Sequence, residues 1–168
     1  PGIVRLLDAG STGDGHPFLV TDYIDGLTLD AWLRQRQPSV PQRLHLFGQI
    51  VAAVAHAHEH LVVHRDIKPG NVLVDANGSA HLLDFGIASV LASESADSQS
   101  TQSAITPAYA APELLDGQRA SVRSDVYALG GLLYFLLCGQ PPLALDGLSM
   151  APMLEAIRHL PPLPPSQR

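Results

Sequence analysis

Shortages of several residue types limit what this sequence can encode. Its 168 residues include one cysteine, Cys138, which excludes an internal disulfide and a cysteine-based zinc site. We interpret Cys138 as a small buried core residue, the common state of a lone thiol. The chain has 10 lysine and arginine residues against 16 acidic ones, a net charge of −6. This balance lacks the basic surface that binds phosphate backbones, so we expect no nucleic-acid partner.

The sequence also lacks a long hydrophobic run. Its longest, residues 126–138, is shorter than the roughly 18–20 residues of a membrane span, which predicts a buried helix and no membrane segment within this chain. The first residues do not resemble a signal peptide, which favours a cytoplasmic location. They also lack an initiator methionine, so we expect a fragment of a longer protein. With 46% hydrophobic residues, the length suffices for one domain with a sizeable core.

Hydrophobic patterns and turn residues predict both strands and helices. Residues 2–10 and 18–24 suit an antiparallel pair of strands. Residues 72–74 and 80–83 suit a hairpin, because Asn77-Gly78 between them favours a tight turn. One helix is predicted after the N-cap Thr28, and a second from a capping box of Ser39 and Gln42 to about Glu59. Two further helices are predicted at 122–138, where Gly139 ends the helix, and at 150–160. The serine-rich segment 89–104 has little to bury and the proline-rich tail 161–168 is predicted to be extended.

The single lysine, Lys68, lies in a polar segment, HRDIKPGN at residues 64–71. A surface ion pair would explain Asp66 and Lys68, but not the spacing of Asn71. Asp84 ends the predicted hairpin that begins at Asn71 and is therefore folded back toward it. The oxygen atoms of Asn71 and Asp84 suit a hard cation such as Mg²⁺. With Lys68 as a mobile positive charge and Asp66 as a proton acceptor, these residues predict a phosphoryl-transfer site.

Three motifs in this order carry a family resemblance: HRDIKPGNVLV at 64–74, DFG at 84–86 and APE at 111–113. They resemble the catalytic loop, the metal-binding loop and the end of the activation segment of eukaryotic-like protein kinases. Residues 18–29 are similar to the adenine-binding hinge of that family, and residues 124–142 to its buried helix. The resemblance extends over essentially the whole chain. It implies an α+β, protein-kinase-like fold and a bacterial-type serine/threonine kinase that transfers the ATP γ-phosphoryl group, with Mg²⁺, to protein hydroxyls.

The resemblance assigns a role to each polar residue of this segment. Asp66 would be the catalytic base, and Lys68 would contact the transferred phosphate in the manner of serine/threonine kinases. Asn71 and Asp84 would hold Mg²⁺. The nucleotide-binding residues it implies are the gatekeeper Thr21, the adenine-bonding backbones of Asp22 and Ile24, the ribose-contacting Thr28, Leu73 beneath adenine, and Leu83 before the metal-binding aspartate.

The resemblance also identifies an activation segment. Arg65, directly before the catalytic aspartate, is typical of kinases that are switched by phosphorylation, because an arginine can pair with a phosphate. Thr101 and Ser103 are the candidate acceptors, although a serine-rich loop carries hydroxyls whether or not it is a switch. Thr106 resembles the residue that helps to confer Ser/Thr preference. Two further residues would be structural: Asp125, which anchors the catalytic loop, and Glu113, which pairs with an arginine in that family.

Departures from the family pattern concern the nucleotide clamp. Gly13 and Gly15 lie between the first two strands, with Phe18 where a third glycine would stand, so they do not form the usual glycine-rich loop. The usual strand lysine is missing, because Lys68 is already assigned. We therefore expect a partial kinase domain at 1–168, with small-lobe strands and hinge at 1–24 and an incomplete large lobe at 25–168. We expect this segment alone to bind ATP weakly and to transfer little phosphate.

Histidines offer a second reading of the same region. His56 and His60 are four residues apart and could form a metal pair on a helix, but no third ligand has a suitable spacing. His58 matches a structural histidine that often precedes the catalytic loop in the kinase family. We therefore predict structural roles for these histidines.

Two alternatives to a protein kinase remain at this stage. A pseudokinase or interaction module would keep the fold without the reaction, but Asp66, Lys68, Asn71 and Asp84 are all intact. A small-molecule phosphotransferase of the aminoglycoside-kinase type shares the aspartate and asparagine spacing, but usually lacks the arginine, the lysine and the APE segment. The partners expected for a protein kinase are protein substrates with serine or threonine, and autophosphorylation or dimerisation would add a second copy of the chain.

Overall fold

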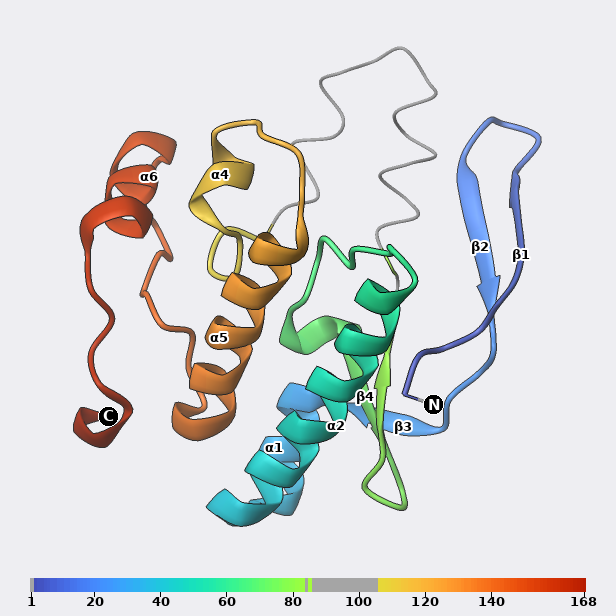
Figure 1. Ribbon diagram of the computed structural model, residues 1–168, viewed down its shortest axis with the longest axis horizontal. Coiled ribbons are helices and arrows are strands. Elements are labelled where there is room, and N and C mark those ends of the chain that lie inside the picture. Colours follow the sequence, from blue (N-terminus) through green and yellow to red (C-terminus); the bar gives the residue numbers. More distant parts are fainter. Residues whose placement is uncertain (1, 84, 86–105) are drawn as a thin grey trace.

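The structure is a computed structural model, which describes residues 2–83, 85 and 106–168. A two-stranded hairpin stands at one end of the molecule, and helices α5 and α6 lie toward the other end (Figure 1). A three-stranded sheet and helix α2 occupy the middle. The predicted serine-rich segment 89–104 lies outside the described residues.

The hairpin consists of β1 (Leu6–Ser11) and β2 (Pro17–Thr21) and confirms the predicted antiparallel pair. Its register pairs Leu6 with Thr21 and Gly10 with Phe18. β1 begins at Leu6, later than predicted, because the residues before it pair with the central sheet instead of with β2. Ile3 forms a parallel bridge with Leu82, whose backbone N–H donates to the carbonyl of Gly2 at 2.8 Å. The start of the chain therefore ties the hairpin to the central sheet.

The central sheet has the order β3-β4-β5, from β3 (Gly26–Thr28), β4 (Val72–Asp75) and β5 (Ala80–Leu82). The β4–β5 pair confirms the predicted hairpin, with Gly78 in the left-handed conformation at φ 80°. β3 was not predicted. Its three residues pair with β4, almost fifty residues later in the chain, as Gly26 with Asp75 and Thr28 with Leu73.

The predicted helices are α1 (Leu29–Arg36), α2 (Val40–Glu59), α5 (Val122–Cys138) and α6 (Met150–His159). Thr28 caps α1 by accepting from the N–H of Ala31 at 3.4 Å, and Gln42 accepts from the N–H of Ser39 at 2.8 Å at the start of α2. Gly139 ends α5 at φ 72°. These contacts confirm the helix boundaries expected from the sequence.

The main core lies where α2 and α5 pack together and against the central sheet. Burying an aliphatic side chain stabilises a fold by about 1.5–3 kcal/mol, and this cluster contains most of the buried hydrophobic side chains among the described residues. Its fully buried members include Leu29 on α1, Ile50 and Val54 on α2, Val72 and Leu82 in the sheet, and Leu132 and Leu136 on α5. Arg43 adds a polar tie by donating to the carbonyls of Leu136 and Leu137 at 3.0 and 3.1 Å.

Short elements complete the fold: η1 (Pro69–Asn71), α4 (Pro112–Leu115) and η3 (Pro165–Gln167). A second, smaller core of Leu143, Leu145 and Ile157 holds α6. The tail was predicted to be extended; that is right as far as Pro164, but residues 165–167 form the turn η3. No helix among the described residues has the length and apolar character to cross a membrane.

Replacing Gly26 by alanine should lower the free energy of unfolding by about 1–3 kcal/mol. An added Cβ at Gly26 would lie 2.7 Å from the backbone oxygen of Val74, so β3 and β4 must separate. Urea unfolding followed by circular dichroism measures the change. Gly48→Ala in α2 is the matched control: its Cβ meets no atom within 4 Å, so it should stabilise the chain by about 1 kcal/mol through helix propensity. Equal effects of the two substitutions would contradict the close β3–β4 packing.

Candidate active site

The polar segment 64–71 connects α2 to β4, and three of its side chains meet there. Lys68 Nζ lies 2.7 Å from Asp66 Oδ2. Asn71 Nδ2 donates to the same Oδ2 and to the carbonyl oxygen of Asp66, both at 2.8 Å. Asn71 is buried, whereas Asp66 and Lys68 are partly exposed. The structure therefore brings the predicted phosphate ligand, Lys68, and one predicted metal ligand, Asn71, to the carboxylate of the predicted base, Asp66.

A buried carboxylate on α5, Asp125, holds the start of this segment. Its Oδ2 accepts from the backbone N–H of His64 at 2.8 Å, and its Oδ1 accepts from the N–H of Arg65 at 2.9 Å. His58 Nε2 on α2 lies 2.7 Å from Oδ2. Because Asp125 is only 1% exposed, these partners offset the cost of removing its charge from water. The family resemblance implies an anchoring role for Asp125 and a structural role for His58.

The anchored backbone adopts an uncommon conformation immediately before Asp66. Arg65 has φ 74°, in the left-handed region that side chains other than glycine rarely adopt. Such a conformation costs about 1–3 kcal/mol and persists only where surrounding contacts hold it. The bond from the Arg65 N–H to Asp125 is one of these contacts. The turn at Arg65 directs the next residue, Asp66, out of the core.

His64 is a buried member of the site for which the sequence predicted no role. Its ring packs on Phe85 with centroids 4.6 Å apart, and its Nδ1 accepts from the N–H of Asp66 at 3.4 Å. Burial lowers the pKa of His64 below its ordinary value of 6.5, despite the nearby Asp125 charge. The ring is therefore neutral at pH 7 and is suited to support the Asp66 backbone rather than to exchange protons.

Of the two predicted metal ligands, Asn71 lies among the described residues. Both Nδ2 hydrogens of Asn71 point at Asp66, which leaves Oδ1 as the atom that can ligate a cation. An amide oxygen is a hard ligand of the kind that Mg²⁺ accepts. The other predicted ligand, Asp84, lies outside the described residues, but the N–H of the preceding Leu83 donates to the carbonyl of Asn71 at 2.9 Å. The chain thus runs past Asn71 immediately before the position of Asp84.

The histidine pair does not form a metal cluster. The His56 and His60 rings lie 4.5 Å apart, and His60 Nδ1 lies 2.8 Å from the carbonyl oxygen of His56. Throughout the described part of the chain, no group of three or more His, Cys, Asp or Glu side chains could hold a metal ion.

Three of the predicted nucleotide-binding residues, Thr21, Thr28 and Leu73, lie in strands. Thr28 is directly opposite Leu73 across β3 and β4, so the predicted ribose contact and adenine floor are neighbours. Thr21 is the last residue of β2. The N–H of Asp22 donates to the carbonyl of Arg5 at 3.0 Å, so the free backbone atom that Asp22 can offer adenine is its carbonyl oxygen. Ile24 lies two residues further along, before β3.

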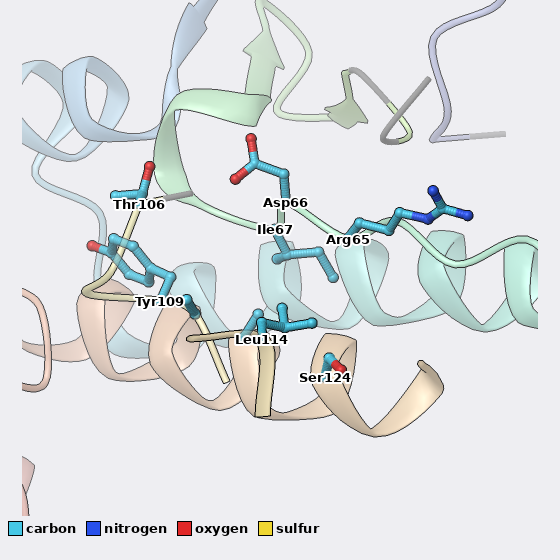
Figure 2. A pocket seen from close by; sticks show the side chains of 9 residues that line it. Arg65, Asp66, Ile67, Thr106, Tyr109, Leu114 and Ser124 are labelled. Atoms are coloured by element: carbon cyan, nitrogen blue, oxygen red, sulfur yellow. The ribbon is translucent and has the colours of Figure 1, made fainter. Parts of the chain in front are cut away.

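A small pocket beside Asp66 is lined by the polar segment 64–71 and by residues from the region of the APE motif. Figure 2 shows Asp66 between Thr106 and Arg65, with Ile67 and Leu114 beneath it. Tyr109 also lines this pocket, and burial, together with the charge of Asp30, raises its pKa to about 12. Its hydroxyl therefore stays protonated at neutral pH. Of the predicted activation-segment residues, Thr101 and Ser103 lie outside the described residues.

Glu113 has a partner that the sequence did not indicate. Its Oε1 accepts from the hydroxyl of Ser124 at 3.0 Å, at the start of α5. Ser124 and Tyr109 were missed as site residues because no local pattern connects them to residues 64–71. Ser124 also belongs to the start of α5, where its Oγ accepts from the N–H of Ser121 at 3.2 Å.

Comparison with known proteins settles the family. A family model described as the protein kinase domain matches residues 1–160. The chain belongs to the protein kinase family. The serine/threonine-protein kinase PrkC of Bacillus subtilis is 39% identical to this kinase segment over 170 residues, covering 100% of the segment and 25% of PrkC. The serine/threonine-protein kinase PknB of Mycolicibacterium smegmatis is 36% identical over 175 residues, covering 100% of the segment and 27% of PknB.

The family assignment confirms the predicted α+β, protein-kinase-like fold class and the predicted likeness to bacterial serine/threonine kinases. The kinase segment spans about a quarter of the length of these curated relatives, 25–27%. The roles of the individual site residues stay predictions.

Replacing Asp125 by alanine should lower the free energy of unfolding of the kinase segment by about 3 kcal/mol or more. The substitution leaves the N–H groups of His64 and Arg65 without their acceptor and removes the partner of His58. Urea unfolding measures the loss. Asp146→Ala removes an exposed carboxylate and should change stability by no more than about 0.5 kcal/mol. A loss for Asp125→Ala as small as that of the control would refute the anchoring role.

The lowered pKa of His64 predicts a pH dependence. Below pH 6.5 the unfolded chain binds a proton at His64 that the folded chain does not, so the free energy of unfolding should fall as the pH falls. Urea unfolding from about pH 8 to about pH 5 measures this slope. His64→Phe should remove part of the slope, while His159→Gln, which changes an exposed histidine, should keep it. An identical slope in the His64→Phe variant would contradict a buried neutral His64.

Proposed function

We propose that this segment is part of a protein serine/threonine kinase, which transfers the γ-phosphoryl group of ATP to serine or threonine hydroxyls of protein substrates. The observation that carries the proposal is the convergence of Lys68 and Asn71 on the Asp66 carboxylate, at 2.7 and 2.8 Å. A base, a mobile positive charge and a metal-ligating oxygen within one turn of chain are the parts that phosphoryl transfer requires.

Each side chain would have a separate task. Asp66 accepts the hydrogen of the substrate hydroxyl and orients that hydroxyl, for which its partly exposed carboxylate is suited. Lys68 stabilises the negative charge of the transferred group. Asn71 keeps Asp66 in place through Nδ2 and offers Oδ1 to Mg²⁺. Asp125 and His64 touch none of the reacting atoms and act as positioning residues for the segment.

ATP and Mg²⁺ are the cofactors that we propose. Mg²⁺ supplies charge neutralisation on the phosphates when it is bound. Asn71 and Asp84 would hold it. Thr21, Asp22, Ile24, Thr28, Leu73 and Leu83 would surround the nucleotide, and the pairing of Thr28 with Leu73 supports one common site for ribose and adenine.

Protein substrates are favoured over small alcohols by the pocket beside Asp66. It is shared by the catalytic segment and by Thr106, Tyr109 and Leu114, from the region of the APE motif. A small-molecule phosphotransferase of the aminoglycoside-kinase type usually lacks that region. The serine/threonine kinase names of PrkC and PknB point the same way.

Residues 1–24 would be small-lobe strands and hinge, and residues 25–168 large lobe. Because ATP is a cytoplasmic nucleotide, we assign the reaction to the cytoplasm.

Thr101 and Ser103 would be phosphorylated in the activation segment, with Arg65 as the phosphate's partner. A second copy of the kinase would carry out this autophosphorylation.

Asp66→Asn should lower the rate of phosphate transfer to a generic basic protein by about 100-fold or more, because amides do not accept the hydroxyl hydrogen as a carboxylate does. The assay uses ATP and Mg²⁺ with the longest natural chain that contains this segment. Aminoglycosides and other small alcohols are tested in parallel as acceptors.

The matched control is Asp146→Asn, which neutralises an exposed carboxylate outside the site and should leave the rate unchanged. Transfer only to small alcohols would favour the aminoglycoside-kinase alternative. Nucleotide binding without transfer to any acceptor would favour a pseudokinase. Transfer that is insensitive to Asp66→Asn would refute the proposed base.

A further inference from the structure

A second motif lies far along the chain from the catalytic segment, where α6 ends. Residues 158–164 read RHLPPLP, and the proposed phosphoryl transfer uses none of them. Their two leucines are exposed, Leu160 by 58% and Leu163 by 50%. Figure 1 shows this stretch at the edge of the molecule, between α6 and the C-terminal turn. Two exposed leucines among prolines therefore call for an explanation.

The prolines impose an extended left-handed helix on this stretch. Each proline fixes its own φ near −65°, and the residue before a proline is kept out of the α region. Leu160 has φ −87° and ψ 115°, and Pro164 has φ −55° and ψ 140°. Pro164 lies near the polyproline II values of about −75° and 145°, and Leu160 is extended with a ψ about 30° lower. Residues 160–164 form no helix or strand in the structure.

The polyproline II repeat arranges the side chains on three edges. With three residues per turn, Leu160 and Leu163 share one edge, and Pro161 and Pro164 share the next. Pro162 lies on the third edge. Two Leu-Pro pairs, one turn apart, therefore present a single ridged face. Grooves with aromatic-lined slots recognise ridges of this kind.

A positive charge stands at one end of the ridge. Arg158 lies three residues before Pro161, in the last turn of α6, and its side chain is 39% exposed. Its guanidinium forms an ion pair with Asp116, the residue that follows α4. An exposed ion pair is weak, so an acidic pocket on a partner can compete for Arg158. The charge at one end would also fix the direction in which the ridge binds.

Both ends of the ridge are held by the fold. At one end, Ile157 is buried in the small core with Leu143 and Leu145. At the other end, η3 contacts α5, and Arg168 Nη1 donates to Gln140 Oε1 at 2.6 Å. A segment that is already extended and tethered loses little conformational entropy when a partner binds.

We propose that residues 158–164 are a docking segment for a protein module with two aromatic-lined slots and an acidic pocket. The slots take Leu160–Pro161 and Leu163–Pro164, and the pocket takes Arg158. This is the recognition mode of SH3 domains. The inference is independent of phosphoryl transfer and would stand if the proposed kinase reaction failed.

The probe is a purified SH3 domain that prefers proline-rich ligands with an arginine at their start, titrated by calorimetry into the longest natural chain that contains residues 158–164. We expect saturable binding with one site per chain. Leu163→Ala should weaken it about tenfold or more, because it empties a slot. Pro162→Ala, on the edge that faces away from the groove, and Leu148→Ala, at another exposed leucine, should leave it nearly unchanged. Absence of binding, or equal losses for Leu163→Ala and Pro162→Ala, would overturn the proposal.

The ion pair of Arg158 gives a second test with the opposite sign. Asp116→Ala frees the guanidinium and should strengthen binding about two- to fivefold. Arg158→Ala should weaken binding both in the natural chain and in a chain that already carries Asp116→Ala. An affinity that does not respond to either substitution would show that Arg158 takes no part in docking.

Discussion

The conformation of the polar segment 64–71 depends on one buried carboxylate, Asp125 on α5. Asp125 accepts hydrogen bonds from the backbones of His64 and Arg65 and contacts His58, all within 2.9 Å. A buried carboxylate is costly unless its oxygens are satisfied, so the same three contacts that stabilise Asp125 also fix the loop. The bond from the Arg65 N–H to Asp125 helps to hold the left-handed conformation of Arg65, which immediately precedes the partly exposed Asp66. The backbone that precedes the proposed base, Asp66, is thus held by a carboxylate inside the core.

The hydrophobic core transmits this constraint. Asp125 stands on α5 and His58 on α2, and these helices pack together through residues such as Val54 and Leu132. On the other side of the segment, the β4–β5 hairpin returns the chain so that Leu83 bonds to Asn71. The polar segment 64–71 is therefore held by contacts to α2, to α5 and to the end of the β4–β5 hairpin. Apolar packing sets the positions of these elements. Interiors are close-packed, so a shift of either helix would displace Asp66.

The sequence predicted the features that depend on local patterns. These patterns act within a few residues of one another. They are the caps at Thr28 and Ser39, the Asn77-Gly78 turn, and the short spacing of Asp66, Lys68 and Asn71. β3 was missed because its three residues become a strand only by pairing with distant β4. The roles of His64 and Tyr109 were missed for the same reason: burial and tertiary neighbours create them, and no spacing encodes either.

The contact between Lys68 and Asp66 has a consequence for the proposed reaction. At 2.7 Å, the ammonium group occupies the carboxylate oxygen that also accepts from Asn71. If Asp66 is to receive a substrate hydroxyl at Oδ2, Lys68 has to release that oxygen and would then turn toward the phosphate. Side-chain exposures of 24% for Lys68 and 34% for Asp66 keep this pair in contact with water, where ion pairs are weak. Asn71 is buried and stays. In the proposed reaction the site would thus combine a buried amide, which keeps the Asp66 carboxylate oriented, with a partly exposed lysine that moves from this carboxylate to the group being transferred.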